Sequence, residues 1–379
     1  MTQPATTRSD RLTSMLPPVP PAPQPAQLTW LGCDLRTGRI AEELPALTPT
    51  GSLSRRLGAY TSAAFTLALA GAPAAWEAAT DPGRTMLVAL ADEIPVWAGI
   101  VLTRSGGSAG TVQLGVATPE AYLDRRYARD HTWTQQDETS VIAAGLIGDT
   151  ALDGIGLTID APAAGRVRDR AYRGADDATV LSRLQELMGV DGGPEWTIDV
   201  RWHSDTTRLE LIARVRQRIG VQSASPAAVF THPGDVAAYE LFESYEAGRG
   251  ATVVQARGEG EGDSRASSSE TVAADLIASG WPRYEYRWTP GTAITSKNIL
   301  DSHAQAALAL LRPGARVWSV DAVATQAPRL GRDWQIGDNI RLQVLTSPRH
   351  PAGVDMAGRA WGWDWDPRAD RISPILAEE

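Results

Sequence analysis

The sequence is poor in several residue types from which cross-links and catalytic sites are commonly built. Cys33 is the only cysteine and Lys297 the only lysine, and the 379 residues include five histidines and three phenylalanines. A single cysteine excludes a disulfide bond within the chain, so a reducing cytosol is a sufficient place for folding. Cys33 lies in an expected strand, where a small buried residue is its simplest role.

Long hydrophobic runs are also missing. No stretch of about 18 apolar residues occurs, so no membrane span is expected, and the N-terminal segment lacks the apolar core of a secretory signal. The net charge of −9 argues against a general nucleic-acid-binding protein, which needs a basic surface. The length is sufficient for two or three domains, each with its own core.

What the chain does contain predicts a mainly β protein with an α+β insert. The pattern divides it into an extended proline-rich arm (1–27), a first β-barrel-like domain (28–117), an α+β insert (118–215), a mixed connecting region with a mobile loop at 258–270 (216–300) and a second β-barrel-like domain (301–379). Either a free tail or a strap that orders against a neighbouring subunit would suit the arm.

Alternating apolar residues carry the β assignment. The segments 85–91 and 96–104 flank a short connection at Asp92–Pro95 and predict a hairpin. Near the C-terminus, "GDNIRLQV" places a Gly337-Asp338 turn before Ile340, Leu342 and Val344, which share one face of an expected half-buried strand.

Helix signals cluster in the insert and before the second β domain. Segment 118–129 begins with a threonine, a proline and an early glutamate, segment 138–149 is a second expected helix, and segment 176–189 has an apolar stripe closed by Gly189. Two strands, at 195–202 and 207–215, complete the insert, and a further helix is expected at 296–311.

Two glycine-rich motifs resemble a catalytic turn and a phosphate-binding loop, but the elements that follow them in the sequence do not fit either site. "GGSAG" at 106–110 fits the nucleophile-elbow pattern with Ser108 as nucleophile, but a strand follows it where the elbow needs a helix. "GEGEG" at 258–262 has neither the spacing nor the following helix of a phosphate-binding loop. Both are interpreted as ordinary loops.

The remaining polar groups show no catalytic or metal-binding spacing. The histidines are scattered and have no ligand pattern; they are His131, His203, His232, His303 and His350. The arginine-rich stretches 125–129 and 166–173 are interpreted as salt-bridged helix or loop faces. No catalytic, cofactor-binding or metal-binding residue is therefore assigned, and no cofactor is expected.

The stretch "WGWDWD" at 361–366 allows three interpretations. In a strand, Trp361, Trp363 and Trp365 share one face, and Asp364 and Asp366 lie on the other. The rings could stack on sugars, the carboxylates together with Asp370 could bind Ca²⁺, or the stripe could face a core or an interface with its acids in solvent. The last interpretation is preferred.

Three segments give the chain a resemblance to a known family. They are "VWAGIVLTRSGGSAGTVQLGVATPEAYLDRR", the helix "SKNILDSHAQAALALL" and the strand entry "WQIGDNIRLQV". In this order they are similar to the tail hub proteins of long-tailed bacteriophages, the baseplate-hub or late-control-D-like group. The resemblance covers residues 28–379.

The resemblance implies a structural, non-enzymatic minor tail protein of a phage tail tip. It implies a homotrimer whose paired barrels match the hexameric tail tube or a distal tail protein and surround DNA in transit without binding it specifically. Contacts with a tape-measure protein and with a tail fibre or spike would follow, in a virion component made in the bacterial host cytoplasm. The alternatives are a carbohydrate-binding module and a cell-surface polysaccharide hydrolase that use the Trp361–Trp365 strand.

Overall fold

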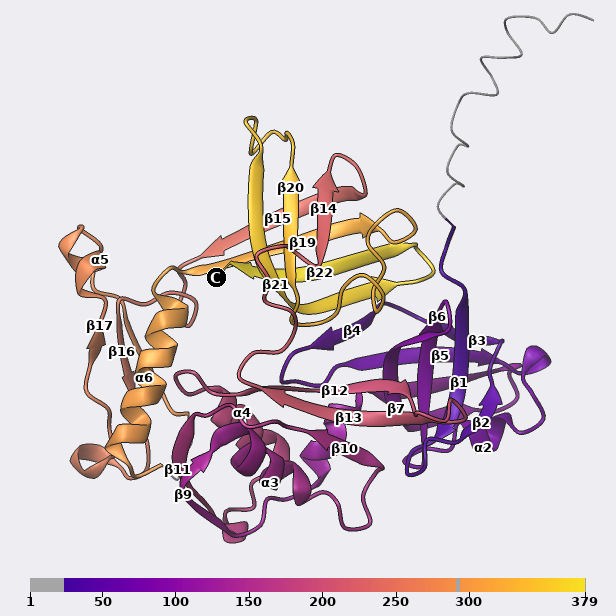
Figure 1. Ribbon diagram of the computed structural model, residues 1–379, viewed down its shortest axis with the longest axis horizontal. Helices are drawn as coiled ribbons and strands as arrows, with labels where there is room; N and C mark the ends of the chain where they lie inside the picture. Colours follow the sequence, from indigo (N-terminus) through magenta and orange to yellow (C-terminus); the bar gives the residue numbers. More distant parts are fainter. Residues whose placement is uncertain (1–23, 291–293, 379) are drawn as a thin grey trace, which may run out of the picture.

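Figure 1 shows a computed structural model of the chain, which describes residues 24–290 and 294–378. The greater part of the expected N-terminal arm, residues 1–23, lies outside the described residues. The mainly β fold with an α+β insert that the sequence predicts is confirmed.

Seven antiparallel strands form the first barrel-like sheet. Their order is β2 (Ile40–Glu43), β1 (Leu28–Asp34), β6 (Thr85–Ala91), β7 (Ile94–Gly106), β8 (Thr111–Ala117), β5 (Ser62–Ala68) and β3 (Leu47–Pro49). The two edge strands, β2 and β3, are consecutive in the chain and joined by residues 44–46. The sheet therefore curls until its edges approach each other, as closure of a barrel requires.

The predicted hairpin of this sheet is confirmed, with a tighter turn than expected. Strands β6 and β7 pair up to Ala91 and Ile94, so the turn consists of Asp92 and Glu93 alone. Both turn residues have positive φ, at 50° and 67°. That conformation is typical of two-residue turns whose twist matches the twist of the flanking strands.

The second barrel-like sheet combines strands from distant parts of the sequence. Its order is β14 (Ala228–His232), β20 (Asn339–Val344), β21 (Val354–Asp366), β22 (Arg371–Glu378), β19 (Ala315–Val323) and β15 (Val236–Ser244). As in the first barrel-like sheet, the two edge strands are consecutive in the chain, here joined by residues 233–235.

Strands β14 and β15 correct the expected limits of the second β unit. They lie in the predicted connecting region 216–300, but β14 pairs in parallel with β20 and β15 pairs with β19. A partner about a hundred residues away leaves no local signal, whereas the predicted strand at Gly337–Val344 is found with Ile340, Leu342 and Val344 buried.

The two barrel-like sheets share one hydrophobic core. Its largest members come from both sheets and from the loops beside them: Trp30, Phe65, Trp97, Phe230, Trp318, Trp334, Trp363 and Trp365. A further strand, β4 (Leu53–Arg56), leaves the first unit and pairs with β21 of the second (Figure 1). The sheets are therefore joined both by side-chain packing and by main-chain hydrogen bonds.

The insert packs on the other face of the first barrel-like sheet. It contains a three-stranded sheet of β10 (Leu157–Asp160), β13 (Leu209–Arg216) and β12 (Glu195–Trp202), the hairpin of β9 (His131–Asp137) and β11 (Val167–Tyr172), and helices α3 (Ala144–Gly148) and α4 (Val180–Met188). Leu181, Leu184 and Leu187 of α4 are buried, which confirms the predicted apolar stripe.

One local prediction for the insert is wrong and another holds only in part. The helix expected over 118–129 begins after Thr118 as predicted but is a shorter 3₁₀ helix, Pro119–Arg125, in which Glu120 is buried against Arg55 and β12. The arginine-rich stretch 166–173, expected on a helix or loop, is mostly strand β11. Tertiary contacts of charged side chains override local propensity in both places.

A third, smaller unit stands beside the insert (Figure 1). Helix α6 (Lys297–Leu311), predicted within one residue, covers a three-stranded sheet of β17 (Thr271–Val272), β16 (Val253–Ala256) and β18 (Glu285–Trp288). Two short helices, α2 (Trp76–Ala79) and α5 (Ala274–Ala278), complete the described α-helices. In the described part of the chain no helix is long and apolar enough to cross a membrane.

His303 of α6 lies at the contact between this unit and the insert. The side chain is buried, and Nδ1 donates a hydrogen bond to the carbonyl oxygen of Gly189 at 3.2 Å. Burial lowers the pKa of His303 from 6.5 to about 4.

Acidification should therefore destabilise this contact. Between pH 6.5 and 4 the unfolded His303 binds a proton that the folded one does not, so its contribution is fully present above pH 6.5 and falls as the pH decreases. We expect a loss of about 2 kcal/mol between pH 7 and pH 5, measured by urea denaturation. His303→Asn keeps a donor for Gly189 and should remove this part of the pH dependence; an unchanged profile in that variant would contradict the assignment.

Candidate functional site

The tryptophan stripe is part of the core. Trp363 and Trp365 are buried in the core that the two barrel-like sheets share, and Trp361 packs against its edge. The core-facing interpretation is confirmed. The buried rings of Trp363 and Trp365 offer no face to a sugar, and the Arg359 guanidinium lies over the half-buried ring of Trp361. The observation that supported the carbohydrate-binding and hydrolase alternatives is thereby weakened.

The acids of the same strand are half-exposed, so the prediction of a solvent-exposed acidic face holds only in part, and their carboxylates are also hydrogen-bonded to the protein. Both carboxylate oxygens of Asp364 accept hydrogen bonds from Arg56 Nη2, at 2.9 and 3.0 Å, and one also accepts from the Ser54 hydroxyl. Asp366 accepts from the backbone N–H groups of Arg368 and Ala369. Asp370 binds Thr325. The carboxylates considered as calcium ligands thus accept hydrogen bonds from donors within the protein.

These contacts lead to strand β4, whose residues point alternately to its two sides. Ser54 and Arg56 bind Asp364 on one side, and Arg55 points to the other side, into the insert. One short strand therefore bonds the first unit to the second barrel-like sheet and to the insert.

Arg55 is the centre of a buried ionic cluster. Nη1 donates to Asp199 at 2.8 Å, and Nη2 donates to Thr197 Oγ1 at 2.6 Å and to Glu120 at 3.2 Å. Burial alone would lower the pKa of Arg55, but the carboxylates of Asp199 and Glu120 outweigh it and raise the pKa. The cluster borders a cavity of about 300 Å³ where the first barrel-like sheet, the insert and the second β unit meet.

A second buried ion pair joins the insert to the second barrel-like sheet. Arg359 Nη1 and Nη2 donate to the two oxygens of Glu195 at 2.7 and 2.6 Å, and both side chains are at most 9% exposed. Arg359 also donates to the carbonyl oxygen of Ile219, and Glu195 accepts from the Ile219 N–H. The pair thus holds the linker that leaves the insert.

The predicted Gly337-Asp338 turn holds the same linker from the other side. Asp338 accepts from the N–H groups of Val221 and Gln335 at 2.7 and 2.8 Å. The backbones of Gly220 and Gly337 cross so closely that a Cβ on Gly337 would lie 2.4 Å from the Ile219 oxygen. The sequence predicted the turn, and only the structure shows that it clamps residues 219–222.

We call these contacts together the barrel junction; it consists of Arg55, Glu120, Asp199, Glu195, Ile219, Gly220, Gly337, Asp338 and Arg359. Its charged members are buried except Asp199, whose side chain is 22% exposed, and each is paired or hydrogen-bonded within the protein. The arrangement is suited to fixing the two barrel-like sheets and the insert relative to one another.

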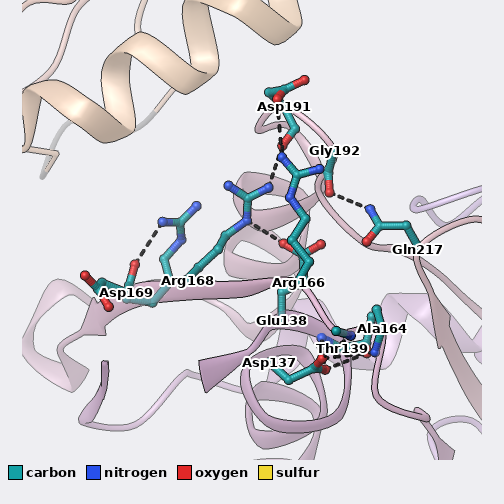
Figure 2. A network of polar contacts seen from close by, with 12 residues as sticks. Asp137, Glu138, Thr139, Ala164, Arg166, Arg168, Asp169, Asp191, Gly192 and Gln217 are labelled. Carbon is teal, nitrogen blue, oxygen red and sulfur yellow. Dashed lines mark hydrogen bonds and ion pairs between the residues drawn. The ribbon is translucent and has the colours of Figure 1, made fainter. Parts of the chain in front are cut away.

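The arginines of stretch 166–173 form a second polar network, shown in Figure 2. Arg168 binds the buried carboxylate of Glu138, and Arg166 and Arg168 both donate to the carbonyl oxygen of Asp191. The salt-bridged interpretation is confirmed for these two side chains. Beside them Asp137 accepts four backbone N–H bonds, from residues 139, 140, 164 and 165. Partial burial would raise the pKa of Asp137, but these bonds hold it well below its usual range.

The other candidates remain apart. Ser108 is exposed in the β7–β8 hairpin loop, so the nucleophile elbow is absent there. His131 pairs with Asp149, His203 with Asp205, and His350 with Tyr239. Within residues 24–290 and 294–378, no group of three histidine, cysteine, aspartate or glutamate side chains is placed to hold a metal ion. Burial raises the pKa of Cys33 to about 12.

Solved structures share this architecture over nearly the whole chain. The tail protein from Neisseria meningitidis MC58 superposes with a TM-score of 0.56 at 14% identity, covering 94% of this chain and 97% of its own. The fold is that of phage tail proteins. The 43 kDa tail protein of prophage MuSo2 from Shewanella oneidensis gives 0.54 at 13% identity, with 93% and 98% covered. The prophage tail protein gp18 from Listeria monocytogenes EGD-e gives 0.53 at 10% identity, with 93% and 95% covered.

Comparison of the sequence alone does not detect this similarity. No protein-family model matches the chain, and no curated protein matches its sequence. The fold that the tail-hub resemblance implied is confirmed by the structural matches.

The Arg359–Glu195 pair gives a direct test of the barrel junction. Glu195→Gln leaves a buried guanidinium without its charge partner, which should lower the free energy of unfolding by about 3–5 kcal/mol. The measurement is urea denaturation followed by tryptophan fluorescence.

A matched control is the exposed pair of Arg341 and Asp355, whose side chains are 42% and 48% exposed. Asp355→Asn should cost less than about 1 kcal/mol. Equal losses in the two variants would mean that the buried pair has no special role.

Gly337→Ala tests the backbone crossing. Gly337 has a φ of +90°, and an added Cβ would collide with Ile219, so we expect a loss of roughly 1–3 kcal/mol. Gly107→Ala, in the exposed β7–β8 loop where a Cβ meets nothing within 4 Å, should leave the thermal midpoint almost unchanged. A tolerated Gly337→Ala would contradict the crossing.

Proposed function

We propose that the protein is a structural hub of a phage tail tip, and that it acts as a homotrimer. The observation that carries this proposal is the pair of barrel-like sheets with edge strands consecutive in the chain, held in one orientation by a shared core and the barrel junction. Three such chains would present six similar barrels around one axis, which suits a hexameric tail tube or distal tail protein on one side and threefold components on the other.

A closed ring requires that each subunit bind its neighbour through two different surfaces. Two barrels of similar build within one chain provide such surfaces, because the contact within a subunit can resemble the contact between subunits. For the six barrels to remain evenly spaced, the angle between the two barrels of one chain must not vary. Buried ion pairs between Arg359 and Glu195 and around Arg55 support that requirement.

The proposed ring would enclose part of the path for DNA. The net charge of −9 supports passage without adhesion, because like charges repel the phosphate backbone. We propose further that the tape-measure protein and a fibre or spike meet the same ring, and that the chain reaches the virion from the host cytoplasm. No catalytic step is part of this role.

The mass of the particle in solution tests the proposal. Light scattering of the purified chain, alone and with its tube protein, should give about three times 40.5 kDa, or a three-chain complex that forms only on the tube protein. A chain that stays monomeric at high concentration and with the tube protein present would refute the hub function.

A further inference from the structure

An apolar groove separates the insert from the third unit. It has a volume of about 380 Å³ and is lined by Met188, Gly189, Val190, Gly248, Tyr286, Trp288, Ala306, Ala307, Leu310 and Leu311. Every lining residue is apolar, aromatic or a glycine. Such a surface favours an uncharged occupant.

Two aromatic rings and one leucine dominate this groove. Tyr286 and Trp288 are alternate residues of β18, so they project from the same face of that edge strand, and both remain partly exposed. Leu310 on α6 is 75% exposed, the highest value among the large hydrophobic side chains described. Grooves lined by aromatic side chains are the kind that binds polyproline segments.

The chain itself contains a segment of matching chemistry. Residues 16–23 read "LPPVPPAP", with five prolines and no charge. Proline-rich segments favour the extended polyproline conformation and lose little entropy when they bind.

The position where this segment joins the fold decides which groove it can occupy. Its carboxyl end continues into Gln24, whose carbonyl oxygen accepts from Arg329, and into Gln27, whose N–H donates to Asp92 at the β6–β7 turn. In Figure 1 this entry to β1 and the groove beside α6 lie on opposite sides of the molecule. Residues 16–23 are the eight residues directly before Gln24 and span roughly 25 Å when extended. They therefore stay near the entry to β1 of their own subunit and reach the groove of a neighbouring subunit that packs against that side.

We propose that residues 16–23 of one subunit bind in the Tyr286–Trp288–Leu310 groove of the next. The contact is head to tail, so three copies of it close a ring. It rests on the proposed trimer and adds to it a strap that joins the exterior of adjacent subunits. Pro20 and Pro21 would pack between the two rings, with the Tyr286 hydroxyl donating to a peptide carbonyl.

Cross-linking between differently tagged full-length chains tests the strap. One chain carries Val19→Cys and the other Leu310→Cys, the two are co-expressed, and a short bis-maleimide is added. We expect a covalent dimer that contains one chain of each kind. The buried Cys33, with its raised pKa, should not react.

The control replaces Leu310→Cys with Leu345→Cys, a leucine 61% exposed directly after β20. This pair should give no dimer; equal yields from the two pairs would overturn the proposal. Cross-linking within one chain, in a Val19→Cys/Leu310→Cys double variant, would overturn it in favour of an arm that folds back on its own subunit. If the Leu310→Cys chain cross-links to added tube protein instead of to the Val19→Cys chain, the groove binds the tube protein and the proposal is overturned.

Light scattering on the same samples separates this inference from the proposed function. A three-chain particle without the mixed dimer would refute the strap and leave the hub intact. A monomer without the mixed dimer, in the presence of the tube protein, would refute both.

Discussion

The fold depends on a single backbone crossing, where the linker that leaves the insert passes against the turn that opens strand β20. Gly220 and Gly337 meet there with no room for a side chain. Arg359 and Glu195 close over the crossing, and Asp338 binds the next residue of the linker. Since these groups are buried, each needs its partner in place, and few other orientations of the insert and the two barrel-like sheets would satisfy all of them.

The buried groups at this crossing restrict the orientation of the units without adding much to the free energy of unfolding. Buried ion pairs often add little net free energy, because desolvation offsets their attraction. The apolar core shared by the two barrel-like sheets supplies most of the driving force for their association. We infer that the ionic groups at the barrel junction select one arrangement among those that the apolar core would allow. A fixed arrangement is what the proposed ring-forming function requires.

Local patterns in the sequence were sufficient for most single elements and insufficient for their connections. Helices α4 and α6 and strands β12 and β20 lie where periodicity and turn residues place them, and the tryptophans of β21 face the core as preferred. The transfer of β4 to the second barrel-like sheet, the parallel pairing of β14 with β20 and the burial of Glu120 against Arg55 could not be read from the sequence. Each depends on a partner 65 or more residues away, and alternation carries no information about such partners.

An end-on image of the assembled particle by electron microscopy tests the proposed hub most directly. Three chains built as described should project six barrel-sized densities, evenly spaced around a threefold axis, with the insert and the third unit outside them. Three isolated densities, or a two-barrel particle with no ring, would show that the rigid barrel junction does not serve a sixfold match and would refute the proposed hub.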